Sequence, residues 1–274
     1  MSVGRRDRTR RENGGGEAKN GTGLRTTLPA EAPPRFEVRV LPGAAGLAEA
    51  AAREFRSASD EAIAARGVFR VALSGGSTPR LLHERLTRRP FRRGIEWGRI
   101  RFFFGDERCV PPDSDRSNYL MAARTLLGPL KIPADRVFRI HGEFPPKRAA
   151  AEYAGALETE FAGERGRPRL DLVLLGLGPD GHTASLFPGT RALEERDTPV
   201  AANWVPKLRE WRITMTYPVL DAARRVVFLV AGQEKAAPAA AIIRRTKAGK
   251  DLPAARVRPR RGSLLWLLDE SAGG

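Results

Sequence analysis

Short apolar runs that alternate with helical patterns are the feature that most restricts the fold of this 274-residue sequence. The runs occupy residues 68–73, 100–105, 170–178, 224–232 and 263–269. Several are apolar throughout, which is typical of parallel strands that are buried on both faces. We therefore expect an α/β fold, a Rossmann-like and mostly parallel sheet with helices on both faces.

The first residues of the chain differ from the rest. Residues 1–34 are polar and Gly-rich, hold seven basic and four acidic residues, and cannot bury enough apolar surface to offset the entropy of ordering. We expect a disordered basic leader there. Residues 36–41 then alternate like a strand, and residues 45–66 carry a helical apolar face that Gly67 closes. No second boundary follows, so residues 35–274 are expected to form a single α/β domain.

Composition restricts the partners and the compartment. No run approaches the roughly eighteen apolar residues that span a membrane, no secretory signal is recognisable, and the single cysteine, Cys109, excludes an internal disulfide framework. A cytoplasmic protein without a membrane partner is expected. The formal net charge of +16 could indicate polyanion binding. However, Arg far outnumbers Lys alongside much Ala and Gly, and a coding bias explains that equally well. We expect a solvated basic surface and no specific nucleic-acid partner.

Residues 172–190, LVLLGLGPDGHTASLFPGT, contain a G-x-G-x-x-G pattern after an apolar run. A dinucleotide-binding loop needs a long helix after its last glycine. Here Pro188 and Gly189 would end any helix within two turns, so the glycines are expected to let the backbone turn near a ligand. Asp180 and His182 follow the same strand, and imidazole suits a base near neutral pH. A capped turn beside a satisfied buried histidine is an equally good interpretation.

A second glycine-containing loop, SGGSTP, follows the run at 68–73 and precedes a helical pattern over 79–88. Its glycines leave the backbone open to a ligand, and free N–H groups at a helix N-terminus favour an anion such as phosphate. The G-K-[ST] element of nucleotide-triphosphate loops is absent. An ordinary Gly-Ser turn is the alternative. The candidate phosphate-binding residues are Ser74, Gly75, Gly76, Ser77 and Thr78.

Two basic residues, Arg108 and Lys235, follow other apolar runs. Ligands of open parallel sheets bind beyond the carboxyl ends of the strands, so all these loops are expected at one edge of the sheet. Both cations could help to neutralise a phosphomonoester there. Taken singly, each is more often a surface charge.

Together these segments resemble the 6-phosphogluconolactonase family, within the glucosamine-6-phosphate isomerase/deaminase-like fold. The resemblance runs from about residue 36 to 269, in order, through LSGGSTPRLL, FFFGDERCVPPDSDRSNY, DLVLLGLGPDGHTASLFPGT, WRITMTYPVL, VVFLVAGQEKA and RPRRGSLLWLLD. It implies hydrolysis of 6-phospho-D-glucono-1,5-lactone to 6-phospho-D-gluconate in the oxidative pentose phosphate pathway, without a cofactor. The implied partner is the small sugar-phosphate lactone.

The resemblance also implies roles for particular residues. His182 is then the base with Asp180 beside it, and the SGGSTP loop holds the substrate phosphate with Arg108 and Lys235 as helpers. Two further residues match positions near the pocket, the acidic Asp106 and the basic Arg212. Two departures concern the pocket rim: VPKLREWRIT, where relatives are often Pro-rich, and Asp221, where Asn usually follows PVL.

The implied chemistry needs orientation, a base and support for an oxyanion, because a six-membered lactone is already activated. We expect His182 to take a proton from water as it attacks C1, with Asp180 orienting the imidazole or stabilising its cation. Backbone N–H groups or Arg108 would support the oxyanion. No metal is expected, because His83, His141 and His182 show no ligand spacing; the first two are expected to be structural or surface residues.

Three rival interpretations remain. A covalent route through Ser185 or Cys109 has no sequence-evident base with an orienting partner. An amino-sugar-phosphate deaminase or ketol isomerase shares the implied fold, but the glutamate that follows the histidine closely in deaminases is absent here until Glu194. A non-enzymatic sugar-phosphate or polyanion-binding protein would suit the charge, yet aromatic residues are only 7% of the chain, sparse for a stacking surface. The sequence does not specify the oligomeric state.

Overall fold

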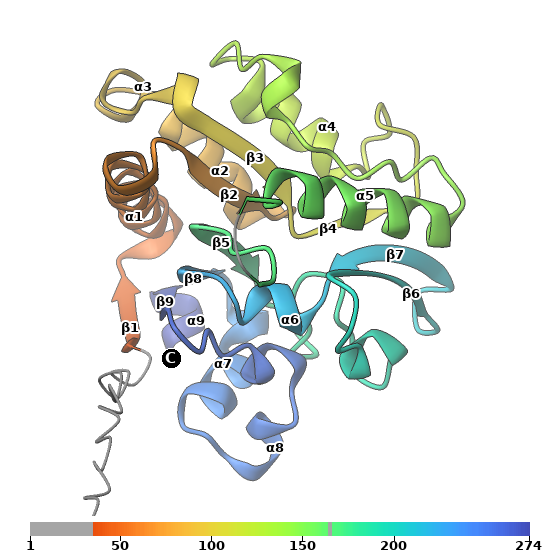
Figure 1. Cartoon of the computed structure of the whole chain (residues 1–274). Coiled ribbons are helices and arrows are strands. Elements are labelled where there is room, and N and C mark those ends of the chain that lie inside the picture. Colours follow the sequence, from red (N-terminus) through yellow and green to blue (C-terminus); the bar gives the residue numbers. More distant parts are fainter. Residues whose placement is uncertain (1–34, 164–165) are drawn as a thin grey trace, which may run out of the picture. The chain divides into compact units, whose positions relative to one another are not determined.

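The computed structural model describes residues 35–163 and 166–274 (Figure 1). Six strands form one sheet in which every neighbouring pair is parallel, so the predicted α/β architecture with a mostly parallel sheet is confirmed. The predicted leader, residues 1–34, lies outside the described residues. In spatial order the strands are β1 (Arg35–Leu41), β9 (Ser263–Asp269), β8 (Arg225–Val230), β5 (Leu172–Gly176), β2 (Phe69–Leu73) and β3 (Ile100–Phe104).

The strand order reverses between β2 and β5, which pair directly through Val71 with Leu172 and Ala72 with Val173. From β2 the chain proceeds outward to β3, whereas β5, β8 and β9 lie in turn on the other side. A crevice outside the carboxyl ends of the strands is expected at such a reversal. The SGGSTP loop leaves β2 and the GLGPDGH segment leaves β5, so the topology brings these two loops together.

The long helix α1 (Gly43–Arg66) packs with α2 (Ser77–Leu86) against the sheet. Its buried face includes the apolar residues predicted from periodicity, and the N–H of Gly67 closes it by donating to the Ile63 carbonyl (2.8 Å). The helix predicted over 79–88 begins two residues earlier. The other α-helices among the described residues are α3 (Phe91–Gly94), α4 (Asn118–Ala122), which continues as a π-helix (Ala123–Leu127), α5 (Pro146–Glu160), α6 (Tyr217–Leu220), α7 (Ala236–Ile243), α8 (Lys247–Lys250) and α9 (Glu270–Gly273).

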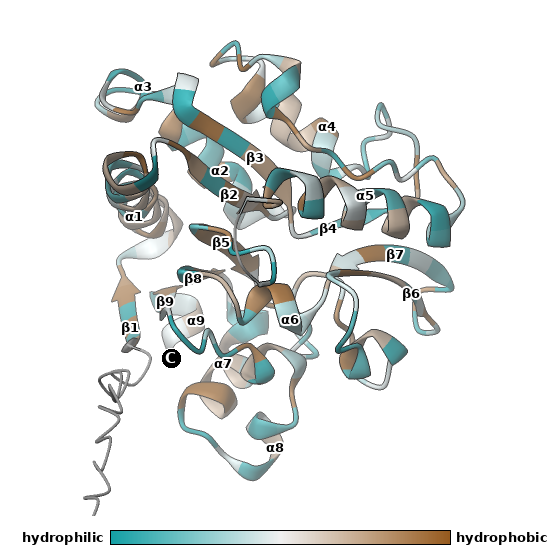
Figure 2. Cartoon of the chain, in the orientation of Figure 1, coloured by the Kyte–Doolittle hydropathy of each residue, from teal (hydrophilic) through white to brown (hydrophobic). Residues whose placement is uncertain are grey.

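The core lies along the parallel strands. Figure 2 shows brown, hydrophobic segments on β3 and β5 in the interior and teal, hydrophilic segments on the surrounding loops. The strand residues Phe102, Phe103 and Leu174 are at most 1% exposed, as expected for strands covered on both faces. No helix in the described part of the chain is both long and apolar enough to cross a bilayer.

A second, antiparallel sheet was not predicted. It has the order β4 (Asp106–Arg108), β7 (Glu210–Met215), β6 (Val200–Val205) and starts where β3 ends, because the Met215 N–H donates to the Gly105 carbonyl (2.8 Å). β4 is short and charged, so its sequence is typical of a loop. The small sheet matters for the site because hydrogen bonds join β4 and the β6–β7 hairpin to the loop after β5. Asp106 on β4 also holds Asn118, whose side chain lies against Gly75 of the SGGSTP loop.

Candidate active site

A cavity of about 240 Å³ lies at the reversal point of the strand order. Its walls include both glycine-containing loops, so the two segments that the sequence singled out face one space. Of the candidate site residues, those in its lining are Ser74, Gly75, Gly76, Ser77, Thr78, Asp106, Arg108, His182 and Lys235. A further cavity, of about 550 Å³, lies among α5, the π-helix and the loop around Phe138, and none of these residues lines it.

The side chain of Asn118 lies against Gly75 of the SGGSTP loop. A Cβ atom added to Gly75 would lie 1.8 Å from the Asn118 amide oxygen, so only glycine fits there. The hydroxyl of Ser74 is buried and has no hydrogen-bond partner among the described residues, although the residue lines the cavity. The loop therefore offers backbone and hydroxyl groups to a ligand rather than filling the space itself.

Asp106 connects the two loops. Its carbonyl and its Oδ1 accept from the Asn118 amide (2.9 and 3.3 Å), and its Oδ2 accepts from the Ser185 hydroxyl (2.7 Å). All three residues are at least nine-tenths buried. Because Asn118 lies against Gly75 and Ser185 belongs to the loop after β5, this network fixes the separation of the two loops.

Glu107 anchors the start of α4 from the same strand. Its buried carboxylate accepts the N–H groups of Arg108, Asn118 and Tyr119 (2.8 Å each) and the hydroxyl of Ser117 (3.0 Å). Burial raises the pKa of Glu107, and the three backbone N–H groups oppose that rise. Neither Glu107 nor Asn118 was predicted as a site residue, although both occur in the motif stretch FFFGDERCVPPDSDRSNY; which of its polar residues turn inward depends on the fold.

His182 forms a hydrogen-bonded pair with Asp180, with 2.5 Å between Nδ1 and Oδ1. Burial alone would raise the pKa of Asp180, but hydrogen bonds from His182 and Lys207 outweigh it and lower the pKa to about 2. Since the carboxylate is ionised near neutral pH, Nδ1 carries the proton and Nε2 is left as the basic nitrogen. Nε2 makes no hydrogen bond to any described residue. The ring stacks on Phe187 with 4.0 Å between centroids.

The glycine pattern of this loop serves the imidazole. A Cβ atom on Gly178 would lie 2.0 Å from Nδ1 and Cε1 of His182, so the ring occupies the space that a side chain would take. No helix follows Gly181: residues 182–190 form turns and one isolated bridge between Thr183 and Leu186. The expectation that this loop lacks the long helix of a dinucleotide site is therefore confirmed.

Lys207 reaches the same pair from the β6–β7 hairpin. Its ammonium group lies 2.9 Å from Oδ2 of Asp180, the carboxylate oxygen that His182 does not use. This lysine lies within the stretch VPKLREWRIT, and no role is predicted for it from the sequence. Its contact with Asp180 depends on the second sheet, which was not foreseen.

Of the three cations predicted near the site, two line the cavity and one does not. Arg108 and Lys235 line the cavity; Arg108 donates to the carbonyl of Arg116, and Lys235 lies 3.7 Å from the carboxylate of Glu234. Arg212 pairs with Arg108 in the β4–β7 register but does not line the cavity. Its guanidinium donates to Glu210, two residues earlier on the same strand.

The alternative nucleophiles are poorly placed. Ser185 is 1% exposed and donates its hydroxyl to Asp106. Burial raises the pKa of the Cys109 thiol to about 11, which keeps it protonated and weakly nucleophilic. His83 is buried beside the hydroxyl of Thr125 (3.0 Å), and burial lowers its pKa to about 4.

The other histidine, His141, pairs with Glu152 at the second cavity. No group of three or more potential metal ligands occurs within residues 35–163 and 166–274. That the reaction needs no metal stays a prediction.

Fold and site together define an α/β protein in which a glycine-containing loop at the start of a helix and a histidine paired with a carboxylate line one cavity. The sequence profile of the family "Glucosamine-6-phosphate isomerases/6-phosphogluconolactonase" matches residues 42–266. The chain is 40% identical over 238 residues to the 6-phosphogluconolactonase of Nostoc sp. (strain PCC 7120), covering 86% of this chain and 96% of that protein. It is 42% identical over 210 residues to the 6-phosphogluconolactonase of Homo sapiens, covering 76% and 81%.

A solved structure agrees with these sequence matches. The 6-phosphogluconolactonase from Trypanosoma cruzi superimposes with a TM-score of 0.78 at 30% identity, covering 89% of this chain and 98% of that one. The chain therefore belongs to the glucosamine-6-phosphate isomerase/6-phosphogluconolactonase family.

Proposed function

We propose that this protein is a 6-phosphogluconolactonase, which hydrolyses 6-phospho-D-glucono-1,5-lactone to 6-phospho-D-gluconate in the oxidative pentose phosphate pathway. The observation that carries the proposal is the single cavity lined by both the SGGSTP loop and His182. Relatives of about 40% identity over most of the chain have this activity in their names. A cytoplasmic location, expected from the lone Cys109, is part of the proposal.

The substrate phosphate is proposed to bind the loop Ser74–Thr78, which opens the ten-residue helix α2. Free N–H groups at a helix N-terminus favour an anion, and the unpartnered Ser74 hydroxyl adds a donor. Arg108 and Lys235 line the same space and outnumber its one carboxylate, Asp106. The charge of the lining therefore suits a dianionic phosphomonoester.

Hydrolysis is proposed to begin when Nε2 of His182 takes a proton from water as the water oxygen bonds to C1 of the lactone. The C1–O bond to the ring oxygen then breaks, and the protonated imidazole returns the proton to that oxygen. Asp180 holds the proton on Nδ1 throughout and stabilises the cation that forms between the two steps. Backbone N–H groups or the Arg108 guanidinium are proposed to stabilise the oxyanion at C1.

The experiment that tests this function follows lactone hydrolysis by the purified protein against an enzyme-free control, because the lactone also opens spontaneously. Product formation is monitored by coupling to an oxidation of 6-phosphogluconate. We expect turnover well above the control, together with no release of ammonia from glucosamine 6-phosphate. Turnover of the amino sugar alone would replace the proposal with the deaminase interpretation. Binding of either sugar without turnover of the lactone would indicate a non-enzymatic sensor.

A further inference from the structure

The β6–β7 hairpin is fixed to the loop that carries His182. The side-chain amide of Asn203 on β6 donates to the Ser185 carbonyl (2.9 Å) and to the Thr190 hydroxyl (3.0 Å). On β7 the hydroxyl of Thr214 accepts from the Ser185 N–H (3.2 Å). Asn203, Ser185 and Thr214 are at most 1% exposed. Both strands of the hairpin are therefore tied to one residue, three positions after the imidazole.

The turn of this hairpin directs one cation to the catalytic pair. Residues 206–209 join β6 to β7, with the Leu208 N–H bonded to the Val205 carbonyl (3.0 Å) and the Arg209 N–H bonded to the Pro206 carbonyl (3.2 Å). Lys207 lies within this closed turn and its ammonium group contacts Oδ2 of Asp180. Because the turn is hydrogen-bonded and the strands are anchored, this contact is built into the fold even though the lysine side chain is 66% exposed.

We propose that Lys207 is a positioning residue for the lactone hydrolysis proposed above: its ammonium group holds the Asp180 carboxylate against Nδ1 of His182 and offsets the negative charge of that carboxylate beside the imidazole. The proposal rests on that function. Lys207 occupies Oδ2 and so leaves Oδ1 for the imidazole. Its positive charge also compensates Asp180, which would otherwise stabilise the imidazolium, the form that cannot act as a base.

The other charged groups around the imidazole can be separated from this effect. Asp106, Arg108 and Lys235 face His182 across the cavity, and Phe187 covers the ring without a charge. None of them contacts Lys207. A variant at residue 207 therefore changes the field at the imidazole while leaving the phosphate loop and the cavity cations in place.

The test compares Lys207→Met, which keeps the length of the side chain, with Lys207→Arg, which keeps its charge. Lys147→Met is the control, because Lys147 is an exposed lysine on α5 with no ion pair to any described residue. For Lys207→Met we expect the acidic limb of the kcat/KM–pH profile to move up by about half a pH unit. Activity below that limb then falls about threefold, while activity on the alkaline plateau and KM stay close to wild type. Lys207→Arg and Lys147→Met should keep the wild-type midpoint.

A second measurement keeps this proposal separate from the activity itself. Ring signals of the three histidines are titrated by NMR in protein labelled at histidine, with His182→Gln assigning the site signal. The His182 signal should titrate at higher pH in Lys207→Met, and the difference should shrink in high salt, because the lysine is exposed. Superimposable profiles, or a raised KM with an unmoved midpoint, would overturn the role of Lys207. A wild-type protein without lactonase activity would overturn the function but leave the NMR result to decide the positioning role.

Discussion

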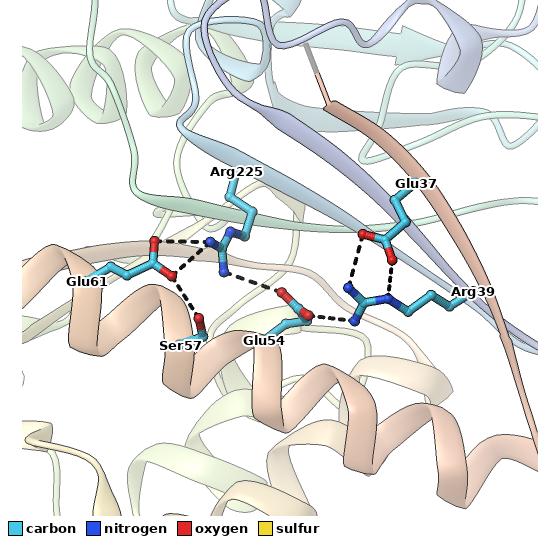
Figure 3. Close-up of polar contacts among 6 residues, drawn as sticks. All are labelled: Glu37, Arg39, Glu54, Ser57, Glu61 and Arg225. Carbon is cyan, nitrogen blue, oxygen red and sulfur yellow. Dashed lines mark hydrogen bonds and ion pairs between the residues drawn. The ribbon is translucent and has the colours of Figure 1, made fainter.

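Two of the sets of alternating charges among the described residues end differently. The ion-pair ladder joins Glu37, Arg39, Glu54, Arg225 and Glu61, and it ties β1 and β8 to α1 (Figure 3). Each of its guanidinium groups contacts two carboxylates, and Glu54 lies between the two. Every charge in the ladder therefore has a partner of opposite sign.

The second set, Lys207–Asp180–His182 at the candidate site, shows the same alternation but is incomplete. It ends at an imidazole whose Nε2 has no partner within the described residues and which lines a cavity. Partners determine the protonation of the carboxylates in both sets. Hydrogen bonding to Arg39 lowers the pKa of Glu37, as His182 and Lys207 lower that of Asp180. A complete ion-pair set therefore holds elements together, whereas the incomplete set leaves Nε2 of His182 open to the cavity.

The largest effect on activity is expected from removing the imidazole of His182, the last residue of the incomplete set. His182→Ala should lower kcat by about 10²–10⁴-fold, because general base catalysis is lost, while the melting temperature changes little. Steady-state lactone hydrolysis, corrected for spontaneous opening, measures this. His141→Ala is the matched control, since His141 also pairs with a carboxylate, Glu152 (2.6 Å), away from the cavity. A His182→Ala enzyme with wild-type kcat would remove the distinction between the two sets.

The next largest effect on activity is expected from a substitution in the SGGSTP loop, which lines the same cavity as the imidazole. Gly75→Ala would drive a Cβ atom into the Asn118 amide and displace the loop or the buried network. Misplacement of a substrate by about 1 Å can cost roughly 10²-fold, so kcat/KM for the phosphorylated lactone should fall by about that factor. Gly98→Ala is the control, because nothing lies within 4 Å of its added Cβ. Equal kinetics for the two variants would contradict an anchoring role for the loop.

The ladder should affect stability and leave activity intact. Glu54→Gln removes the carboxylate shared by Arg39 and Arg225, at a cost of about 1 kcal/mol for a partly buried pair. That corresponds to a fall in melting temperature of roughly 2–4 °C. Calorimetry of Glu54→Gln is compared with Glu84→Gln, whose pairing with Arg80 is more exposed and should contribute less. A fall in kcat with Glu54→Gln would show that the ladder is coupled to the site.

The smallest effect is expected at Asp221, whose carboxylate contacts no guanidinium group within the part of the chain that the structure describes. Burial raises the pKa of Asp221 from 3.8 to about 6, against an opposing hydrogen bond from the Arg258 N–H. The folded state then binds a proton more tightly than the unfolded state, so this residue lowers stability as pH rises from about 4 to 6, and the loss persists above that range. Asp221→Asn should remove the loss, about 1 kcal/mol or less because the side chain is partly exposed.

Melting temperatures of the wild type and of Asp221→Asn at pH 4, 6 and 8 measure this loss of stability. Asp221→Asn should gain on the wild type between pH 4 and 6 and keep that advantage at pH 8. A constant difference at all three values would mean that the charge of Asp221 is not its cause.

Much of the fold followed from the sequence, because the parallel strands are apolar runs with turn residues after them. The strand over Ser263–Asp269 has the predicted bounds, and α1 buries the predicted face. The second sheet was missed, because β4 consists of three charged residues that become a strand only by pairing with β7. Local pattern carries no information on such a distant partner.

The candidate site, like the fold, was predictable only in part. The loops after β2 and β5 could be expected at one edge, since parallel strands end together. Asn118 and Lys207 were not assigned, because their contacts with Gly75 and Asp180 join residues that are 43 and 27 positions apart in the sequence. For Arg212 the sequence suggested a place near the site, and the structure puts its guanidinium on Glu210 instead of in the cavity lining. Side-chain direction of this kind is set by tertiary pairing.

The most direct measurement is a crystal structure of the protein with 6-phosphogluconate, the proposed product. We expect the phosphate to bind the backbone N–H groups of Gly75–Thr78 and the C1 carboxylate to lie within one water molecule of Nε2 of His182. A phosphate bound away from this loop, or a C1 carboxylate turned away from the imidazole, would contradict it.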